Sequence, residues 1–280
     1  MGAFADEAAR RLKSNPAAVA ALSVTCAIIV LTLIGPWISP NDVQTLDWLH
    51  IAARPGQSSH WFGTDRLGRD LFVRTLAGTR VSLAIGMAAS VVSLLVGVTY
   101  GAIAGYIGGR TDHLMMRLIE ILSGLPLIFF VIFLTVIFGR SEYLLFFAIA
   151  AVGWLTMARI VRGQTLSIRQ KEFIEAAIAS GASTGRIILR HVVPNVIGPV
   201  IVYATLTVPQ IILLESFLSF LGLGIQEPGA SLGTLIAEGA AEMEAAPWIL
   251  LVPGSFLATL LLCLNIFGDG LRDALDVKDG

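Results

Sequence analysis

The side chains that could carry out chemistry are few, and most of them border long apolar runs. Ser123, which precedes Gly124, is a conceivable nucleophile, and His113 or His191 could serve as its base. Nucleophilic catalysis also needs a group that orients the base, and no carboxylate is obviously placed to do this. The sequence therefore gives an intramembrane hydrolase little support.

Cofactor chemistry is not expected of this chain either. The sequence has no G-x-x-x-x-G-K-[ST] loop, so it cannot cradle the phosphates of ATP in that way. Its two cysteines, Cys26 and Cys263, form no C-x-x-C pair and are interpreted as small buried apolar residues. A formal net charge of -1 argues against nucleic acid as a partner. An ion channel would need a repeated filter or a ring of pore charges, and neither is evident.

The composition indicates which elements must position these residues. Of the 280 residues, 55% are hydrophobic and 14% are charged, against about 25% charged in soluble domains. A charge at the bilayer centre costs at least roughly 2.5 to 3.5 kcal/mol, so charged residues should mark the ends of membrane spans. Six uncharged stretches then predict an all-α polytopic protein with six transmembrane helices; these are 14–41, 81–109, 121–139, 143–158, 191–214 and 245–268.

The first of these helices should cover residues 16–38 and be retained as an anchor. The stretch is too long for the apolar core of a signal peptide, and Pro36 and Trp37 occupy the place of a small-residue cleavage site. Asn15 followed by Pro16 is a typical start of a helix, because asparagine can cap a helix N-terminus and proline fits the first helical position. The fifth helix should continue past Glu215 to about Leu221.

The distribution of Lys and Arg predicts the orientation. If the N-terminal segment 1–15 lies in the cytoplasm, 13 of the 19 Lys and Arg residues fall on the cytoplasmic side. The C-terminal segment 271–280 is then cytoplasmic as well. Residues 39–80 are then extracytoplasmic. Within them we expect a helix lying in the membrane interface, with Arg66, Arg69 and Arg74 on its polar side, leading into the five-helix core 81–270.

The cytoplasmic loop 159–195 is too long to be a simple connection between two spans. Its centre is helix-forming and ends at Gly181, which permits a sharp turn. The small side chains there would allow a helix to sit deep in the groove of a partner. We expect a docking helix whose contact residues are Glu172, Glu175, Ala176, Ala177, Ser180 and Gly181.

This loop resembles a known family. The run Glu175-Ala176-Ala177, followed by Gly181 and then Pro194, is similar to the EAA loop of permease subunits in ATP-binding-cassette importers. The likeness extends over nearly the whole chain, and it is to the C-type permease subunits of peptide and nickel importers, with the oligopeptide branch most similar. The segments that carry it are 60–65, 68–70, 105–109, 157–165, 171–173, 190–195, 218–224 and 268–273.

The resemblance implies a complex in the bacterial inner membrane. Its other members would be a homologous second permease, two cytoplasmic ATPase subunits and an extracytoplasmic peptide-binding protein. ATP and Mg²⁺ would bind to the ATPases, and this chain would bind no cofactor or metal. It would form half of a pathway for oligopeptides, with dipeptides, nickel and glutathione as alternative cargoes.

Two acidic regions become site candidates on this basis. Glu215 lies inside the fifth span near Phe217, where a carboxylate must be paired, protonated or facing water. It could line the translocation path or be a structural partner in the bundle. The segment 226–246 holds four Glu and no Lys or Arg, so Glu238, Glu242 and Glu244 are expected to face the binding protein.

Overall fold

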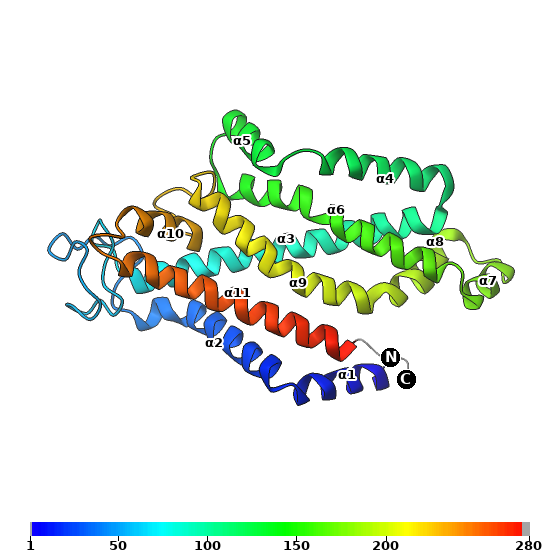
Figure 1. Cartoon of the computed structure of the whole chain (residues 1–280), viewed down its shortest axis with the longest axis horizontal. Helices are drawn as coiled ribbons and strands as arrows, with labels where there is room; N and C mark the ends of the chain where they lie inside the picture. Colours follow the sequence, from blue (N-terminus) through cyan, green and yellow to red (C-terminus); the bar gives the residue numbers. More distant parts are fainter. Residues whose placement is uncertain (1, 276–280) are drawn as a thin grey trace.

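The chain folds into an elongated bundle of helices (Figure 1). The computed structural model describes residues 2–275, so the end of the expected C-terminal segment, including Lys278, lies outside the described residues. The helices are α1 (Gly2–Ser14), α2 (Pro16–Ile38), α3 (Leu71–Ile107), α4 (Gly109–Ser123), α5 (Leu127–Phe138), α6 (Glu142–Ile168), α7 (Glu172–Ala179), α8 (Thr184–Ile187), the π-helical turn η1 (Ile188–Val192), α9 (Val193–Phe220), α10 (Leu232–Ala241) and α11 (Trp248–Leu275).

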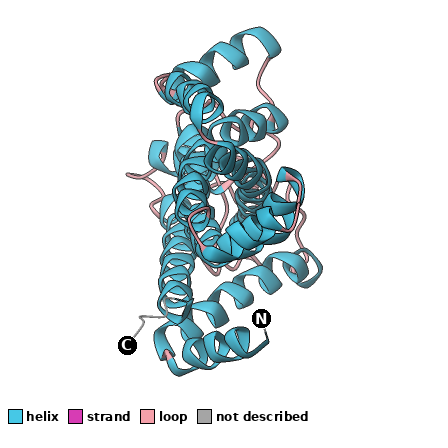
Figure 2. Ribbon diagram, turned by 90° about the vertical axis from the view of Figure 1, so that its right-hand side faces the viewer, coloured by secondary structure: helices cyan, strands magenta, loops and turns pink. Residues whose placement is uncertain are grey.

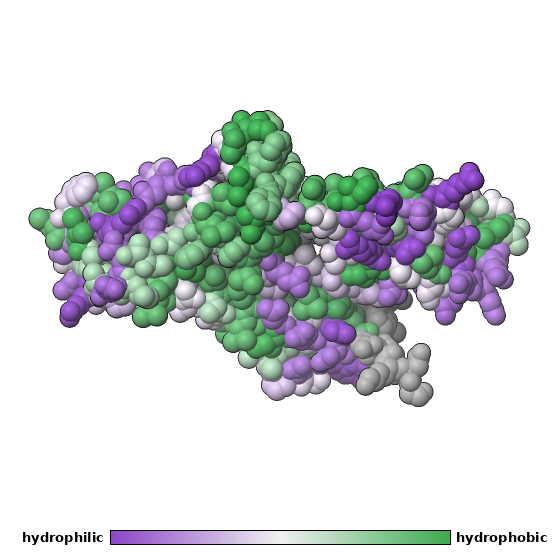
Figure 3. All heavy atoms as spheres, turned by 45° about the horizontal axis from the view of Figure 1, so that its top comes forward, coloured by the Kyte–Doolittle hydropathy of each residue, from purple (hydrophilic) through white to green (hydrophobic). Residues whose placement is uncertain are grey.

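The longest helices run side by side along the long axis of the molecule, and most of them are seen end-on when the molecule is turned by 90° (Figure 2). α3 occupies the centre and packs against α6 and α9, while α2 and α11 form a pair on one side. α2 begins where the sequence predicts, because Asn15 Oδ1 accepts the backbone N–H of Ala18 at 3.2 Å. Side chains of the middle of the molecule are largely hydrophobic, and hydrophilic ones gather toward both ends (Figure 3).

Two glycines, Gly101 and Gly105, bring α3 into close contact with α6. A Cβ added to Gly101 would lie 2.4 Å from the carbonyl oxygen of Ala158, and one on Gly105 would lie 2.8 Å from Thr165 Cβ. No side chain fits at either position without moving the helices apart. Membrane helices use such small residues because close backbone approach increases their van der Waals contact.

Within residues 2–275, five helices are each long and apolar enough to span a membrane, but the third expected span, residues 121–139, is not continuous. α4 and α5 meet at 75° across a break that contains Pro126. Proline cannot continue a helix through this point, since it lacks an N–H and its ring clashes with an earlier carbonyl. α5 has 12 residues, about 18 Å of helix, which is short of the roughly 30 Å hydrocarbon core.

The prediction of six spans is therefore correct only if α4 and α5 count together as one bent crossing. The connectivity supports counting them so. α3 ends near α7, whereas α6 begins beside α5, further toward the α10 end, and the pair α4 and α5 carries the chain between these two points (Figure 1).

The prediction of a separate interfacial helix within residues 39–80 is wrong, because the helical part of this segment belongs to α3. Residues 66–70 form turns, and α3 begins at Leu71 and continues unbroken for 37 residues. Its first turns are buried all round, Arg74 included. The structure has no boundary at residue 80 between an interfacial helix and a span, since α3 runs through this position. Arg69 and Arg74 are neutralised by carboxylates within the protein, so these side chains do not have to face water.

The expected cytoplasmic loop is also shorter than residues 159–195. α6 continues to Ile168 because its arginines find partners on α4. Arg162 pairs with both carboxylate oxygens of Asp112 at 2.5 and 2.6 Å, and Arg159 donates to Ser123 Oγ at 2.5 Å. At the far end of the loop, the turn η1 precedes Pro194. A wider π-turn accommodates a proline that would otherwise clash with the preceding turn of helix.

Candidate functional site

The short helix α7 stands at the end of the molecule that also carries α1 and the end of α11 (Figure 1). It ends in a Schellman motif: Gly181 N–H bonds to Ile178 O at 2.9 Å, and Ala182 N–H bonds to Ala177 O at 3.1 Å. Gly181 has a φ of +75°, a conformation that side-chain-bearing residues seldom adopt. The chain therefore turns here in the way the sequence predicts.

One face of α7 fastens it to the bundle. Ile174 is fully buried in a cluster with Ile187 and Tyr106, and Ala177 packs against the same cluster. Ala177 therefore lies on the inner side of the helix, which corrects its expected place on the docking surface. The remaining docking candidates are exposed: Glu172, Glu175, Ala176, Ser180 and Gly181.

Two exposed apolar side chains extend this surface, and the sequence analysis did not identify them. Phe173 is 42% exposed and Ile178 is 56% exposed. Phe173 lies off the stripe formed by Ile174 and Ala177, and this helical spacing is the signal that could have found it. Ile178 follows Ile174 by four residues, so spacing alone would place it on the buried side, and only the structure shows that it is exposed. We define the docking face as Glu172, Phe173, Glu175, Ala176, Ile178 and Ser180.

Glu215 is fully buried on α9, between α9 and α3. Its carboxylate accepts hydrogen bonds from Ser82 Oγ at 2.7 Å and Ser219 Oγ at 2.8 Å. A carboxylate held by hydroxyls from two helices matches the alternative of a structural partner in the bundle. Phe217, two residues further on, is 47% exposed.

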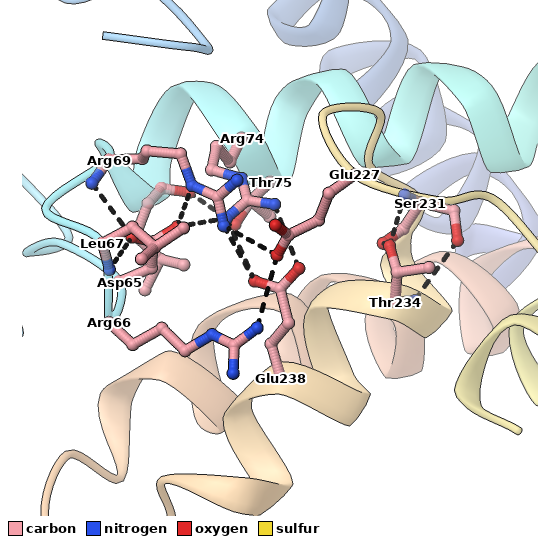
Figure 4. Close-up of polar contacts among 11 residues, drawn as sticks. Asp65, Arg66, Leu67, Arg69, Arg74, Thr75, Glu227, Ser231, Thr234 and Glu238 are labelled. Carbon is pink, nitrogen blue, oxygen red and sulfur yellow. Dashed lines mark hydrogen bonds and ion pairs between the residues drawn. The ribbon is translucent and has the colours of Figure 1, made fainter. Parts of the chain in front are cut away.

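The opposite end of the molecule contains a buried cluster of opposite charges (Figure 4). Arg74 forms an ion pair with Asp65 and two hydrogen bonds with Glu238, at 3.0 and 3.1 Å. Arg69 Nε bonds to Asp65 Oδ2 at 2.6 Å, and its Nη2 lies 3.3 Å from Glu227. The cluster joins the turn before α3, the start of α3, the loop before α10 and α10 itself.

The charges in this cluster stabilise one another. Burial by itself would raise the pKa of Asp65, but Arg74 and the bonds from Arg69 outweigh burial, and the pKa lies below its usual value. Partial burial would likewise raise the pKa of Glu227, but Arg69 and Arg66 together outweigh it, and the pKa lies below its usual value. Asp65 is thus ionised at neutral pH and neutralises two arginines.

This cluster changes the expectation for the acidic segment 226–246. The sequence places no Lys or Arg there, yet Glu227 and Glu238 are paired with arginines more than 150 residues away in the chain. Glu238 is 12% exposed at its side chain, so it is not a free surface charge. Glu244 is exposed and Glu242 is half-buried, and these two carboxylates remain available to a partner.

An all-α bundle with an apolar middle and polar ends has the architecture of a polytopic membrane protein. A chain of the MetNI methionine ABC transporter in an inward-facing conformation has a similar fold, with a TM-score of 0.58, 18% identity, and coverage of 72% of this chain and 96% of that one.

Sequence comparison assigns the family. Residues 97–278 match the family described as binding-protein-dependent transport system inner membrane component, and residues 4–55 match the N-terminal TM domain of oligopeptide transport permease C. The chain belongs to this family, the permease subunits of ABC importers, and is a multi-pass inner-membrane protein.

The relatives are similar along nearly their whole length. The oligopeptide transport system permease protein OppC of Haemophilus influenzae is 54% identical, over 98% of this chain and 88% of the relative. The dipeptide transport system permease protein DppC of Bacillus subtilis is 46% identical, over 98% of this chain and 86% of the relative.

The buried charge cluster leads to a prediction about stability. Arg74→Met should lower the free energy of unfolding by about 3 to 5 kcal/mol, because the buried Asp65 and Glu238 would lose the cation that bridges them and keep only their contacts with Arg69. Arg66→Met is the matched control. Its side chain is 49% exposed and lies 3.5 Å from Glu227, so its loss should cost less than about 1 kcal/mol. Thermal unfolding of both variants in one detergent measures the difference, and equal melting temperatures would contradict it.

Proposed function

We propose that this chain is one of two permease subunits that form the pathway of an ATP-driven oligopeptide importer. The observation that carries the proposal is the 54% identity to OppC over 98% of the chain. The match of residues 4–55 to the N-terminal domain of oligopeptide permease C supports it. Dipeptides are the second candidate cargo, because DppC is 46% identical over a similar length.

Energy would reach the chain through α7. The docking face joins exposed apolar side chains to the carboxylates of Glu172 and Glu175, a combination suited to a groove with an apolar floor and basic rim. On this proposal ATP and Mg²⁺ bind to two separate ATPase subunits, and this chain has no ATPase site. Closure of the ATPases would move α7 as a rigid body, because Ile174 anchors it to the cluster that includes η1 and the start of α9.

The other candidate residues have distinct roles in this proposal. Glu215 fastens α9 to α3 from within the bundle and so shapes the pathway wall without touching cargo. Phe217 faces outward, toward the cargo or the second permease. Glu242 and Glu244, at the end opposite α7, face the extracytoplasmic peptide-binding protein.

The α7 end is proposed to be cytoplasmic, together with both termini. It carries α1 with Arg10, Arg11 and Lys13, and the start of α4 with Arg110. At the opposite end, Arg66, Arg69 and Arg74 are paired with carboxylates. An excess of Lys and Arg is typical of cytoplasmic segments.

The cargo can be tested by reconstitution. Purified together with its partner subunits and placed in liposomes, the complex should take up a labelled tetrapeptide when ATP and the binding protein are present. Uptake of a dipeptide should be weaker, and Ni²⁺ should not enter. Liposomes given ADP in place of ATP are the control. Preferential uptake of Ni²⁺ or of the dipeptide would contradict the oligopeptide proposal.

Orientation can be tested with single cysteines introduced after Cys26 and Cys263 are replaced by Ala. Ser183→Cys lies beside α7 and Glu244→Cys lies at the opposite end, and both positions are exposed. A membrane-impermeant maleimide should label Glu244→Cys in intact cells with the outer membrane opened, and Ser183→Cys only after the inner membrane is permeabilised. Labelling of both from one side, or in the reverse order, would refute the proposed topology.

Coupling through α7 can be tested at Gly181. Gly181→Val forces a β-branched residue to a φ of +75°, which costs about 1 to 2 kcal/mol or more and distorts the turn that ends α7. ATPase copurification and peptide uptake should both fall severalfold, while insertion in the membrane is unchanged.

Gly185→Val is the matched control for this variant. Gly185 is also exposed and open on all sides, but its φ is not in the left-handed region, so valine should be tolerated there. If the Gly181 variant assembles and transports as well as the Gly185 variant does, α7 is not the coupling element.

A further inference from the structure

The loop between α2 and α3, residues 39–70, brings two histidines and an aspartate together. Asp47, His50 and His60 each offer one ligand atom, and these atoms lie within 4.8 Å of one another. His50 Nδ1 is 2.8 Å from Asp47 Oδ2, and His60 Nε2 is 3.5 Å from the same oxygen. Only four histidines occur in the chain, so the meeting of two of them at one carboxylate is a specific feature of this loop.

The second nitrogen of each histidine already has a polar partner. His60 Nδ1 lies 2.7 Å from Asp70 Oδ2, and His50 Nε2 lies 2.7 Å from Ser58 Oγ. If these two nitrogens carry the protons, the lone pairs of His60 Nε2 and His50 Nδ1 point toward Asp47. Metal-binding histidines are usually held in this way, with the free ring N–H donating to a carboxylate or another acceptor.

The arrangement is also firmly supported. His60 is 4% exposed, and Asp70 is fixed because it accepts the backbone N–H of Val73 at the start of α3. Asp47 Oδ1 accepts the backbone N–H of Leu49 at 3.0 Å, which leaves Oδ2 for the histidines.

Space for further ligands lies beside the three residues. A cavity of about 290 Å³ is bordered by Asp47 and His60 together with Thr45, Leu46 and Trp48. It can admit a water or another small oxygen ligand to complete a coordination shell.

We propose that Asp47, His50 and His60 form a binding site for a divalent transition-metal ion of the zinc type. Tetrahedral zinc with bonds of about 2.0 to 2.1 Å places its ligand atoms roughly 3.4 Å apart. The 3.5 Å separation already fits, and the 2.8 Å separation needs to widen by about half an ångström. Two imidazoles favour Zn²⁺, Co²⁺ or Ni²⁺ over Mg²⁺ and Ca²⁺, which prefer oxygen ligands. The ion would tie the loop at Asp47 to the residue pair His60 and Asp70 at the start of α3.

Metal binding can be measured on the full chain in complex with its partner subunits, purified without a polyhistidine tag. After chelator treatment and dialysis, the complex is incubated with Zn²⁺ and separated from free ion, and bound zinc is counted by mass spectrometry. Co²⁺ serves as the spectroscopic probe, because its visible absorption bands report nitrogen and oxygen ligands in a tetrahedral site. We expect one equivalent per chain and no binding of Mg²⁺ at this site.

The variants separate the site from adventitious binding. His50→Gln and Asp47→Asn should weaken zinc binding by more than about 100-fold, and Ser58→Ala by about 10-fold, since it removes only the partner of a ligand. These three side chains are at least partly exposed, so the fold should tolerate the changes. His191→Gln, at the opposite end of the molecule, is the control and should bind zinc normally. Absence of stoichiometric zinc in the wild-type complex, or unchanged binding in the Asp47 and His50 variants, would overturn the proposal.

Discussion

Charge burial is the constraint on which this structure depends. A hydrocarbon surrounding offers no water to solvate a charge, so a charged side chain must lie at a helix end or meet a partner inside the protein. The chain does both. Most Lys and Arg residues lie toward the α7 end, while Arg69 and Arg74 lie inside the protein against Asp65 and Glu238. Glu215 is held by serine hydroxyls.

The two ends of the bundle are therefore built differently. At the end with α10, ion pairs join the start of α3 and the turn before it to α10 and the loop before it. Removal of one partner from a buried ion pair strongly destabilises a fold. These ion pairs make this end of the molecule rigid, and Asp65, Glu227 and Glu238 are paired with arginines. At the other end, α7 is attached by one apolar face around Ile174 and presents the rest of its surface. A small attached helix with an exposed face is suited to transmit the movement of a partner to α9.

Tight helix contacts link the two ends. The glycines of α3 allow the backbone of α6 to approach closely. A hydrogen bond from Ser82 to Glu215 connects α3 to α9. Motion at α7 therefore acts on helices that cannot slide independently, because packed interiors transmit strain with little compression. This supports rigid-body movement of the helices as the mode of coupling in the proposed importer.

The sequence by itself determined the helical class, five of the spans, the cap at Asn15 and the turn at Gly181. Hydrophobic length and local capping chemistry decide these features, and both are readable from neighbouring residues. The family could be recognised for the same reason, from short motifs. Pro126 is a local signal for the break between α4 and α5, which the lengths of the uncharged stretches did not show. The tertiary structure decided the continuation of α6 past Arg159, the inward face of Ala177 and the pairing of Glu238. Each of these depends on a partner distant in sequence or on how far a neighbouring helix can cover a residue. Charge patterns show where neutralisation is needed, but only the packed chain shows which residue supplies it.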